Sequence, residues 1–341
     1  MNDVGQSMKL IFELSKEHRT LPKAEVIACL NAEVISYNIV DSNENILILE
    51  ANVEDEQIKQ LALRLSMTFF IDEFFFSSSN SIKDIKKQSE ANSIEKKGSV
   101  AVRCKNSSKI VDSQMVIQVL ASIYSKDRTV SLENPDIEIR ALINKSTHVG
   151  LKLAEIDRKQ FEKRKVQHRP FFSPISMHPR LARALANLSL VKRNGVFLDP
   201  FCGTGGLLIE AGLIGAKVVG SDIENKMIEG CRKTLDFYKI KNYDLFCSDI
   251  GDIQRHVNEV DAIVTDLPYG KSTTTKGEDI KQLYERAFEN ISKVLKKGGR
   301  AVVGLSNKDM ISLGKKYFSL IETYELRVHR SLTRYFVVYQ N

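Results

Sequence analysis

Residues 195–222 read GVFLDPFCGTGGLLIEAGLIGAKVVGSD and decide the fold class of this 341-residue chain. A short apolar strand runs into Asp199, a glycine turn and an apolar helix follow, and a second buried strand ends at Asp222. Apolar strands that alternate with helices predict a parallel, doubly wound α/β sheet covered on both faces. Three further strands of this kind are expected in YDLFCSD (243–249), DAIVTD (261–266) and RAVVGLS (300–306).

The segments on either side of this pattern complete the expected architecture. At the C-terminal end, 317–329 (YFSLIETYELRVH) and 331–340 (SLTRYFVVYQ) are strands with no helix between them, which predicts an antiparallel hairpin. The N-terminal ~150 residues predict a smaller mixed α/β module, with a helix starting near Pro22 and helical spacing over 57–76. The charged, apolar-poor stretch 155–170 is the expected domain boundary.

The composition excludes several classes of protein. The chain is 43% hydrophobic and 27% charged, as in a globular protein with a buried core, and it offers no apolar window long enough to span a membrane. Its five cysteines lie far apart without a C-x-x-C pair, which argues against a zinc ribbon and favours a reducing cytoplasm. Residues 152–193 hold eleven basic and three acidic residues, an excess that suits either a polyanionic partner or a solvated linker.

Predicted strands end in acidic residues at the edge where open α/β sheets bind ligands. Asp199 precedes Gly203 and Gly205, which permit a tight turn and close approach of a ligand to the backbone. Asp222 is placed to accept hydrogen bonds from ribose hydroxyls, and Asp249 to reach an adenine amino group. Each aspartate alone suits a helix N-cap, but three in register behind a glycine turn favour a nucleotide-type site.

A fourth strand end, Asp266-Leu267-Pro268-Tyr269-Gly270, predicts the kind of substrate. Pro268 has no amide proton, so the chain must turn there instead of continuing a central strand. Asp266 and the backbone carbonyl beside Pro268 can accept the hydrogens of an exocyclic amine, and Tyr269 can stack on a planar base. The composition also suits a plain turn, but its place after three ligand-facing strand ends favours a base-binding site.

These motifs resemble those of class I S-adenosylmethionine-dependent methyltransferases, and most closely the members that methylate exocyclic amines of nucleobases. D-L-P-Y-G with aspartate first is similar to the motif of guanine-N2 methyltransferases of tRNA, whereas adenine-N6 enzymes usually carry N-P-P-Y. LSKEHRTLPKAE (14–25), SVAVRCK (99–105) and VSLENPDIEIRALI (130–143) resemble the THUMP-containing half of the same enzymes. Taken together, nearly the whole chain resembles the archaeal-type tRNA (guanine-10-N2) methyltransferases. The resemblance implies a ferredoxin-like part (1–50), a THUMP RNA-binding domain (51–154), a linker (155–170) and a methyltransferase domain (171–341).

The resemblance also implies a role for each motif residue. S-adenosylmethionine would be the cofactor, and its sulfonium would supply the electrophile, so no metal is expected. Asp266 would accept hydrogen bonds from the target amine and take its proton. The implied cofactor-binding residues are Asp199, Gly203, Gly205, Asp222, Ile223, Asp249 and Ile250, and the implied residues around the target guanine are Asp266, Pro268 and Tyr269.

Contact with RNA is expected from basic residues of the first module and the connector. Such phosphate contacts would position tRNA without reading its sequence, although a lysine run is more often a solvated face. We expect a monomer, with an accessory protein left open, and we expect a fragment without residues 1–150 to fold and bind cofactor without methylating tRNA. The candidate contacts are Lys96, Lys97, Arg103, Lys105, Lys163, Arg164 and Lys165.

Other functions stay open on the sequence alone. A related enzyme could act on another tRNA guanine such as G6, on ribosomal RNA or on an adenine N6 amine. A non-catalytic RNA-binding protein would need neither the glycine turn nor D-L-P-Y-G. A nicotinamide dehydrogenase would carry a full G-x-G-x-x-G, but the third position here is Leu208. The number of methyl groups transferred is not encoded in any of these motifs.

Overall fold

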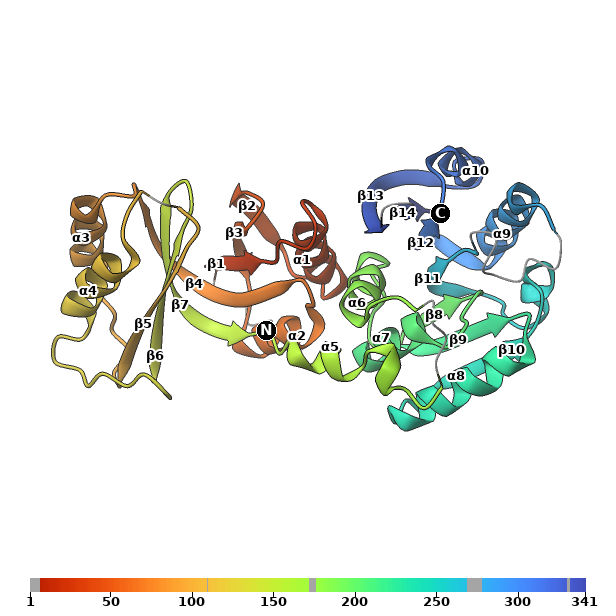
Figure 1. The fold of residues 1–341 in the computed structure, drawn as a ribbon, viewed down its shortest axis with the longest axis horizontal. Coiled ribbons are helices and arrows are strands. Elements are labelled where there is room, and N and C mark those ends of the chain that lie inside the picture. Colours follow the sequence, from red (N-terminus) through yellow and green to blue (C-terminus); the bar gives the residue numbers. More distant parts are fainter. Residues whose placement is uncertain (1–6, 109, 172–175, 269–277, 330–331) are drawn as a thin grey trace, which may run out of the picture. The chain divides into compact units, whose positions relative to one another are not determined.

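The computed structural model describes residues 7–108, 110–171, 176–268, 278–329 and 332–341. Its contacts divide the chain into two compact units, which are coloured along the sequence in Figure 1. Both units are assembled from segments that are separate in the sequence, so the chain crosses between them repeatedly. The first unit comprises Met1–Ser15, Ile35–Leu63 and Thr68–Ile156, and the second comprises Lys16–Val34, Arg64–Met67 and Asp157–Asn341.

A seven-stranded sheet in the order β2-β3-β1-β4-β7-β6-β5 forms the first unit. Its neighbouring strands are antiparallel, except that β5 and β6 run parallel. Helices α3 (Ile82–Ala91) and α4 (Ser113–Tyr124) cover one apolar region of this sheet, whereas α2 (Asp55–Arg64) precedes β4. The strands are β1 (Ser7–Leu14), β2 (Tyr37–Ser42), β3 (Ile46–Asn52), β4 (Thr68–Ser78), β5 (Val100–Asn106), β6 (Ile137–Ile143) and β7 (Thr147–Glu155).

The helical spacing expected over 57–76 is wrong beyond Arg64. Helix α2 ends at Arg64, and strand β4 begins at Thr68 with the sequence TFFIDEFFFSS. Aromatic side chains favour strands, and β4 pairs with β1 on one edge and β7 on the other. The pairing on both edges of a central strand therefore outweighs the helical periodicity of the sequence.

The second unit contains the predicted doubly wound sheet, in the order β10-β9-β8-β11-β12-β14-β13. The first five strands are parallel, and β14 is antiparallel to both β12 and β13. The predicted fold class, a parallel α/β sheet finished by an antiparallel hairpin, is confirmed. The strands are β8 (Val196–Asp199), β9 (Lys217–Asp222), β10 (Tyr243–Cys247), β11 (Val260–Asp266), β12 (Leu295–Leu305), β13 (Ser319–His329) and β14 (Leu332–Gln340).

Helices cover both faces of this sheet and bury a separate apolar core on each. One core contains residues of α6, α7 and α8, and the other contains residues of α9, α10 and the short helix η2. The described ranges include no helix that is both long and apolar enough to cross a membrane. The helices of this unit are α1 (Leu21–Ala32), α5 (Lys159–Lys163), η1 (Val166–His168), α6 (Pro179–Leu188), α7 (Gly206–Ile214), α8 (Asn225–Phe237), η2 (Ile250–Arg255), α9 (Ile280–Val294), η3 (Lys308–Met310) and α10 (Ile311–Gly314).

Helix α1 belongs to the second unit by its contacts, although the sequence places it among the N-terminal residues. Its Leu21 and Ala28 lie in the same apolar core as Ala182 and Leu185 of α6. The sequence predicted the start of this helix correctly, but it gave no indication that the helix packs on a segment more than 150 positions away. The predicted limits of the domains stay a prediction.

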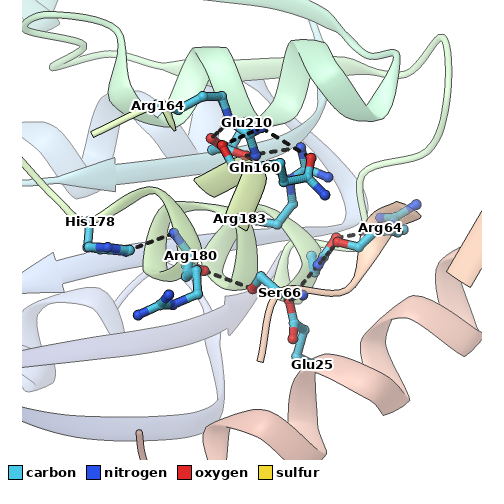
Figure 2. Close-up of polar contacts among 10 residues, drawn as sticks. Glu25, Arg64, Ser66, Gln160, Arg164, His178, Arg180, Arg183 and Glu210 are labelled. Carbon is cyan, nitrogen blue, oxygen red and sulfur yellow. Dashed lines mark hydrogen bonds and ion pairs between the residues drawn. The ribbon is translucent and has the colours of Figure 1, made fainter. Parts of the chain in front are cut away.

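A buried carboxylate on α1 joins three segments of the second unit (Figure 2). Oε1 of Glu25 accepts hydrogen bonds from the Ser66 amide (3.0 Å), the Ser66 hydroxyl (2.6 Å) and the Asn187 side chain (2.8 Å). Oε2 accepts one from the Met67 amide (2.8 Å). Burial raises the pKa of Glu25, while these four donors favour the ionised form and act in the opposite direction.

Candidate active site

A cavity of about 290 Å³ lies at the carboxyl ends of the parallel strands in the second unit. The loops after β8, β9, β10 and β11 line it, and the strand order reverses between β8 and β11. Open α/β sheets bind ligands at such a topological switch point. Eight predicted site residues line this cavity, namely Asp199, Gly203, Asp222, Ile223, Asp249, Ile250, Asp266 and Pro268.

The glycine turn after β8 uses its two predicted glycines differently. Gly203 has φ +49°, and a Cβ added to it would meet nothing within 4 Å, so its backbone faces open space in the cavity. Gly205 has φ +82°, and a Cβ there would lie 2.7 Å from Sγ of Cys231 on α8. Gly205 therefore permits the turn and the approach of α8, and it does not line the cavity.

Asp199 is the most deeply buried carboxyl group of the cavity. Its Oδ1 accepts hydrogen bonds from the Thr265 hydroxyl (2.8 Å) and the Phe201 amide (3.2 Å). Burial raises the pKa of Asp199 to about 7, with the nearby carboxylates of Asp222 and Asp266 acting in the same direction. The cavity thus gathers carboxyl groups, of which Asp199 is only partly ionised near neutral pH. Such a cavity suits a ligand that carries positive charge.

Asp222, at the end of β9, shapes the glycine turn as well as the cavity. Its Oδ2 accepts a hydrogen bond from the Gly203 amide (3.0 Å), and its Oδ1 accepts one from the Glu224 amide (2.9 Å). Burial raises the pKa of Asp222, and the two amides oppose that shift. Each carboxylate oxygen retains a second lone pair, so these bonds leave room for hydroxyl donors from a ligand.

Asp249 both caps a helix and borders the cavity. Its Oδ1 accepts a hydrogen bond from the Gly251 amide (2.7 Å) at the start of η2. The same oxygen pairs with the Arg286 guanidinium (2.7 Å), which also binds Glu278 (2.8 Å). The N-cap interpretation is therefore correct for Asp249, without excluding contact with a ligand.

Asp266 ends strand β11, and its carboxylate pairs with an arginine of β14. Its Oδ2 lies 3.1 Å from Nη1 of Arg334 on β14. Burial raises the pKa of Asp266 to about 6, and the charge of Arg334 opposes this shift. The Tyr284 hydroxyl of α9 donates a hydrogen bond of 2.9 Å to the carbonyl of Pro268, which fixes the turn after the strand. Tyr269, the predicted stacking residue, lies outside the described residues.

Several residues at the site were not found from the sequence. Arg286 and Tyr284 come from α9, Arg334 comes from β14, and Glu278 precedes α9; no local motif indicates that they meet the strand ends. The sequence could have indicated Thr265, because it directly precedes Asp266 at the end of a predicted strand.

The predicted RNA contacts differ in how accessible they are. Arg164 is buried, and its guanidinium donates a hydrogen bond of 2.8 Å to Glu210, which also accepts one from Arg183 (Figure 2). The expected role of Arg164 as a phosphate contact is therefore wrong. Lys165 pairs with Glu162. The remaining five candidates, Lys96, Lys97, Arg103, Lys105 and Lys163, are exposed.

Two of these exposed cations border a cavity within the first unit. Arg103 and Lys105 line a space of about 160 Å³ together with Phe69, Phe70 and Arg140. The Lys105 ammonium lies 4.3 Å from the centre of the Phe69 ring, and it also pairs with Glu13. Both lysine contacts lie within the unit, so the lysine is oriented rather than freely rotating.

Comparisons with known proteins agree with this geometry. The model of the UPF0020 family, described as an RMKL-like methyltransferase domain, matches residues 166–335. The tRNA (guanine(10)-N2)-dimethyltransferase of Methanothermobacter thermautotrophicus is 37% identical over 96% of this chain and 98% of that protein. The protein of the same name from Methanocaldococcus jannaschii is 32% identical over 96% of this chain and 99% of its own length.

Solved structures show the same fold at lower identity. TrmN from Thermus thermophilus has a TM-score of 0.56 and 19% identity, covering 98% of this chain and 100% of that one. SMU.472, complexed with SAH, has a TM-score of 0.53 and 14% identity, covering 98% and 99%. The fold extends over both units, and the two archaeal proteins are 37% and 32% identical to this chain over nearly their whole length. The chain therefore belongs to the methyltransferase family that contains these archaeal tRNA (guanine(10)-N2)-dimethyltransferases.

Proposed function

We propose that this protein transfers methyl groups from S-adenosylmethionine to the exocyclic N2 amine of a guanine in tRNA, at position 10. The observation that carries the proposal is Asp266, which ends a buried strand in a switch-point cavity beside the carboxylates of Asp199 and Asp222. The named activity of the two archaeal relatives supports the base, the atom and the position.

The residues around the cavity fit the proposed cofactor. The open backbone of Gly203 and the acidic Asp199 would receive the methionine part, whose ammonium and sulfonium are positive. Asp222 would bind the ribose hydroxyls, Ile223 and Ile250 would flank the adenine ring, and Asp249 would face the adenine amine. When bound, S-adenosylmethionine would supply the methyl group as a sulfonium-activated electrophile.

Asp266 would act on the substrate side of the same cavity. The lone pair of a guanine N2 amine is delocalised into the ring, so the amine is a weak nucleophile. A carboxylate that accepts its hydrogens orients the amine, increases the electron density on nitrogen and can hold the proton that is lost on methylation. The carbonyl beside Pro268 would accept the second hydrogen, and Tyr269 would stack on the base.

We also propose that the first unit binds tRNA as a THUMP-containing module. The exposed Lys96, Lys97, Arg103 and Lys105 support this proposal, and exposed Lys163 extends the basic residues into the connector. Contacts of this kind neutralise phosphates and make binding strongly dependent on salt. The proposed module boundaries are 1–50, 51–154 and 155–170, followed by the catalytic domain at 171–341.

Transfer of tritiated methyl groups into an unmodified tRNA transcript tests the proposal directly. Digestion to nucleosides should place the label in N2-methylguanosine or N2,N2-dimethylguanosine, and mapping should place it at position 10. Label in N6-methyladenosine, or at another guanine, would overturn the assignment of base or position. The Asp266→Asn variant serves as the control with strongly reduced methyl transfer.

Asp222→Ala is expected to weaken binding of S-adenosylmethionine by about 1–3 kcal/mol, because hydrogen bonds between a carboxylate and the ribose would be lost. Asp222→Asn retains one acceptor oxygen and should lose less. Isothermal titration calorimetry measures both, with Asp252→Asn as the control, because the Asp252 side chain on η2 is 45% exposed and does not line the cavity. A dissociation constant for Asp222→Ala equal to that of the parent would reject the ribose assignment.

Binding of S-adenosylmethionine should become about tenfold tighter between pH 6 and pH 8, because burial raises the pKa of Asp199 to about 7. Below that pH Asp199 is largely protonated, and a positively charged ligand must displace its proton; above it the ionised carboxylate is already present. Calorimetry in buffers of different ionisation enthalpy should detect proton release at pH 6 and little at pH 8. Affinity in the Asp199→Asn variant should be flat over the same range, and an equally steep dependence in that variant would exclude Asp199 as the cause.

A further inference from the structure

We propose that Arg334, at the start of strand β14, is a positioning residue for methyl transfer: its guanidinium holds the Asp266 carboxylate in its working orientation. The inference rests on the proposed role of Asp266. The motif that contains Asp266 does not contain Arg334, which follows it by 68 positions and reaches it only through the sheet. Its Nη1 lies 3.1 Å from Oδ2 of Asp266.

The antiparallel hairpin explains why an arginine stands at this edge. Strands β11 and β12 both end there, whereas β14 runs in the opposite direction and begins there. Asp266 is in register with Gly304 of β12, and Gly304 is in register with Phe336 of β14. Arg334 precedes Phe336 by two residues, so it lies on the same face of β14 and closer to the cavity edge.

Gly304 of β12, the strand between β11 and β14, leaves the space in which the Asp266 carboxylate and the Arg334 guanidinium meet. A Cβ added to Gly304 would lie 2.4 Å from Oδ1 of Asp266 and 3.0 Å from Cε1 of Phe336. No side chain can occupy this position without displacing the carboxylate. The absence of a side chain at 304 thus lets the Asp266 carboxylate lie over β12, within reach of the guanidinium from β14.

The positive charge of Arg334 favours the ionised form of Asp266 in surroundings that otherwise oppose it. Among the residues that the structure describes, charged or titratable side chains approach Asp266 from three elements, namely Asp199 of β8, Tyr284 of α9 and Arg334 of β14. Of these three, Arg334 alone is positive. Burial raises the pKa of Asp266 and Arg334 lowers it, so loss of the guanidinium would raise it further.

The ion pair of Arg334 and Asp266 is not expected to contribute much to the stability of the fold. The side chain of Arg334 is only 9% exposed, and replacing a buried ion pair with apolar groups is often neutral or stabilising. A fixed carboxylate at the place where an amine must be aligned, in contrast, has a direct effect on rate. Misplacement by about 1 Å at a reacting centre can cost on the order of a hundredfold.

The test compares Arg334→Met, which removes the charge but keeps a long apolar side chain, with Arg334→Lys, which keeps the charge and loses the fork of donors. Single-turnover methylation of tRNA at saturating cofactor should fall about 10–100-fold in Arg334→Met and less in Arg334→Lys. The acidic limb of its pH profile should move upward by at least about one pH unit in Arg334→Met. KM for tRNA and the dissociation constant for cofactor should stay within about twofold of the parent.

Two further variants keep the outcome interpretable. Arg300→Met removes an arginine from the middle of β12, where it contacts the carbonyl of Leu188, and should leave the pH profile in place. Gly304→Ala displaces the Asp266 carboxylate without touching Arg334 and should lower the rate as Arg334→Met does. If Arg334→Met fails to fold, Arg334→Gln, which also removes the charge, takes its place in the same comparison.

The inference and the proposed function can fail separately. A parent-like rate in Arg334→Met, or a reduced rate without a shift of the acidic limb, would overturn the role of Arg334 while Asp266→Asn remains inactive. Full activity of Asp266→Asn would instead overturn the proposed role of Asp266. In the double variant Asp266→Asn/Arg334→Met, no loss beyond that of Asp266→Asn is expected, because the arginine acts through the carboxylate.

Discussion

Asp266→Asn should lower the rate of methyl transfer to tRNA by about 10²–10⁴-fold, the usual contribution of a group that accepts a proton in the transition state. An amide in its place loses the negative charge and one acceptor oxygen, so it can neither hold both hydrogens of the amine nor take a proton. Asp266→Ala should be at least as inactive. Affinity for S-adenosylmethionine should stay nearly unchanged, because the proposed cofactor contacts come from the loops after β8, β9 and β10.

The dependence of the parent activity on pH provides a second measure of the same group. The ionised carboxylate is the active form, and burial raises the pKa of Asp266 to about 6. The single-turnover rate should therefore rise between pH 5 and pH 7 and level off above, with the cofactor kept saturating so that Asp199 does not contribute. Asp252→Asn, on the exposed face of η2, is the matched control. Retained rate with lost cofactor binding in Asp266→Asn would contradict the assignment.

The sequence predicted the edge of the sheet where the site lies, because its signals there are local. Three of the parallel strands are apolar runs that end at Asp199, Asp222 and Asp266, and parallel strands of one sheet present these ends at one edge. The glycine turn could likewise be recognised from Gly203 and Gly205, since positive φ angles favour glycine. A local pattern was sufficient wherever backbone direction alone determined the position of a side chain.

The sequence did not predict contacts that depend on how distant segments pack. Arg334 reaches Asp266 across β12, and Arg286 reaches Asp249 from α9, with nothing in either segment to mark the partner. Arg164 was expected on the surface because its neighbours are charged, yet it pairs with Glu210 inside the protein. Composition indicates charge, but only the packed fold decides which charges are compensated internally.

The place of α1 has the largest consequence for how the protein can be divided. The sequence suggested that a fragment without residues 1–150 would fold and bind cofactor. The structure leads us to expect the opposite, because Lys16–Val34 and Arg64–Met67 belong to the same compact unit as Asp157–Asn341. Leu21, Ala28 and Met67 share the apolar core of α6, and Glu25 anchors Ser66, Met67 and Asn187 with four hydrogen bonds.

A fragment of residues 157–341 is therefore expected not to fold stably. Loss of a buried Leu or Met side chain from a core costs about 2–5 kcal/mol, and several such contacts together exceed a large part of the ~5–15 kcal/mol that stabilises a typical domain. In the fragment, Asn187 would also lose its buried partner Glu25, and the face of α6 that packs on α1 would become exposed. Circular dichroism and calorimetry should show no cooperative unfolding transition for the fragment, and no binding of S-adenosylmethionine should be measurable.

Point variants of the full chain separate the effect of α1 from that of truncation. Glu25→Ala leaves the amides of Ser66 and Met67 and the side chain of Asn187 without their buried acceptor, and it should lower the free energy of unfolding by on the order of 3 kcal/mol. Asn31→Ala changes an exposed side chain of the same helix and should have little effect. A synthetic peptide of residues 16–34 should raise the stability of the fragment, because it restores the face of α6. Cooperative unfolding of the fragment alone, with cofactor affinity equal to that of the full chain, would show that α1 is dispensable for the catalytic unit.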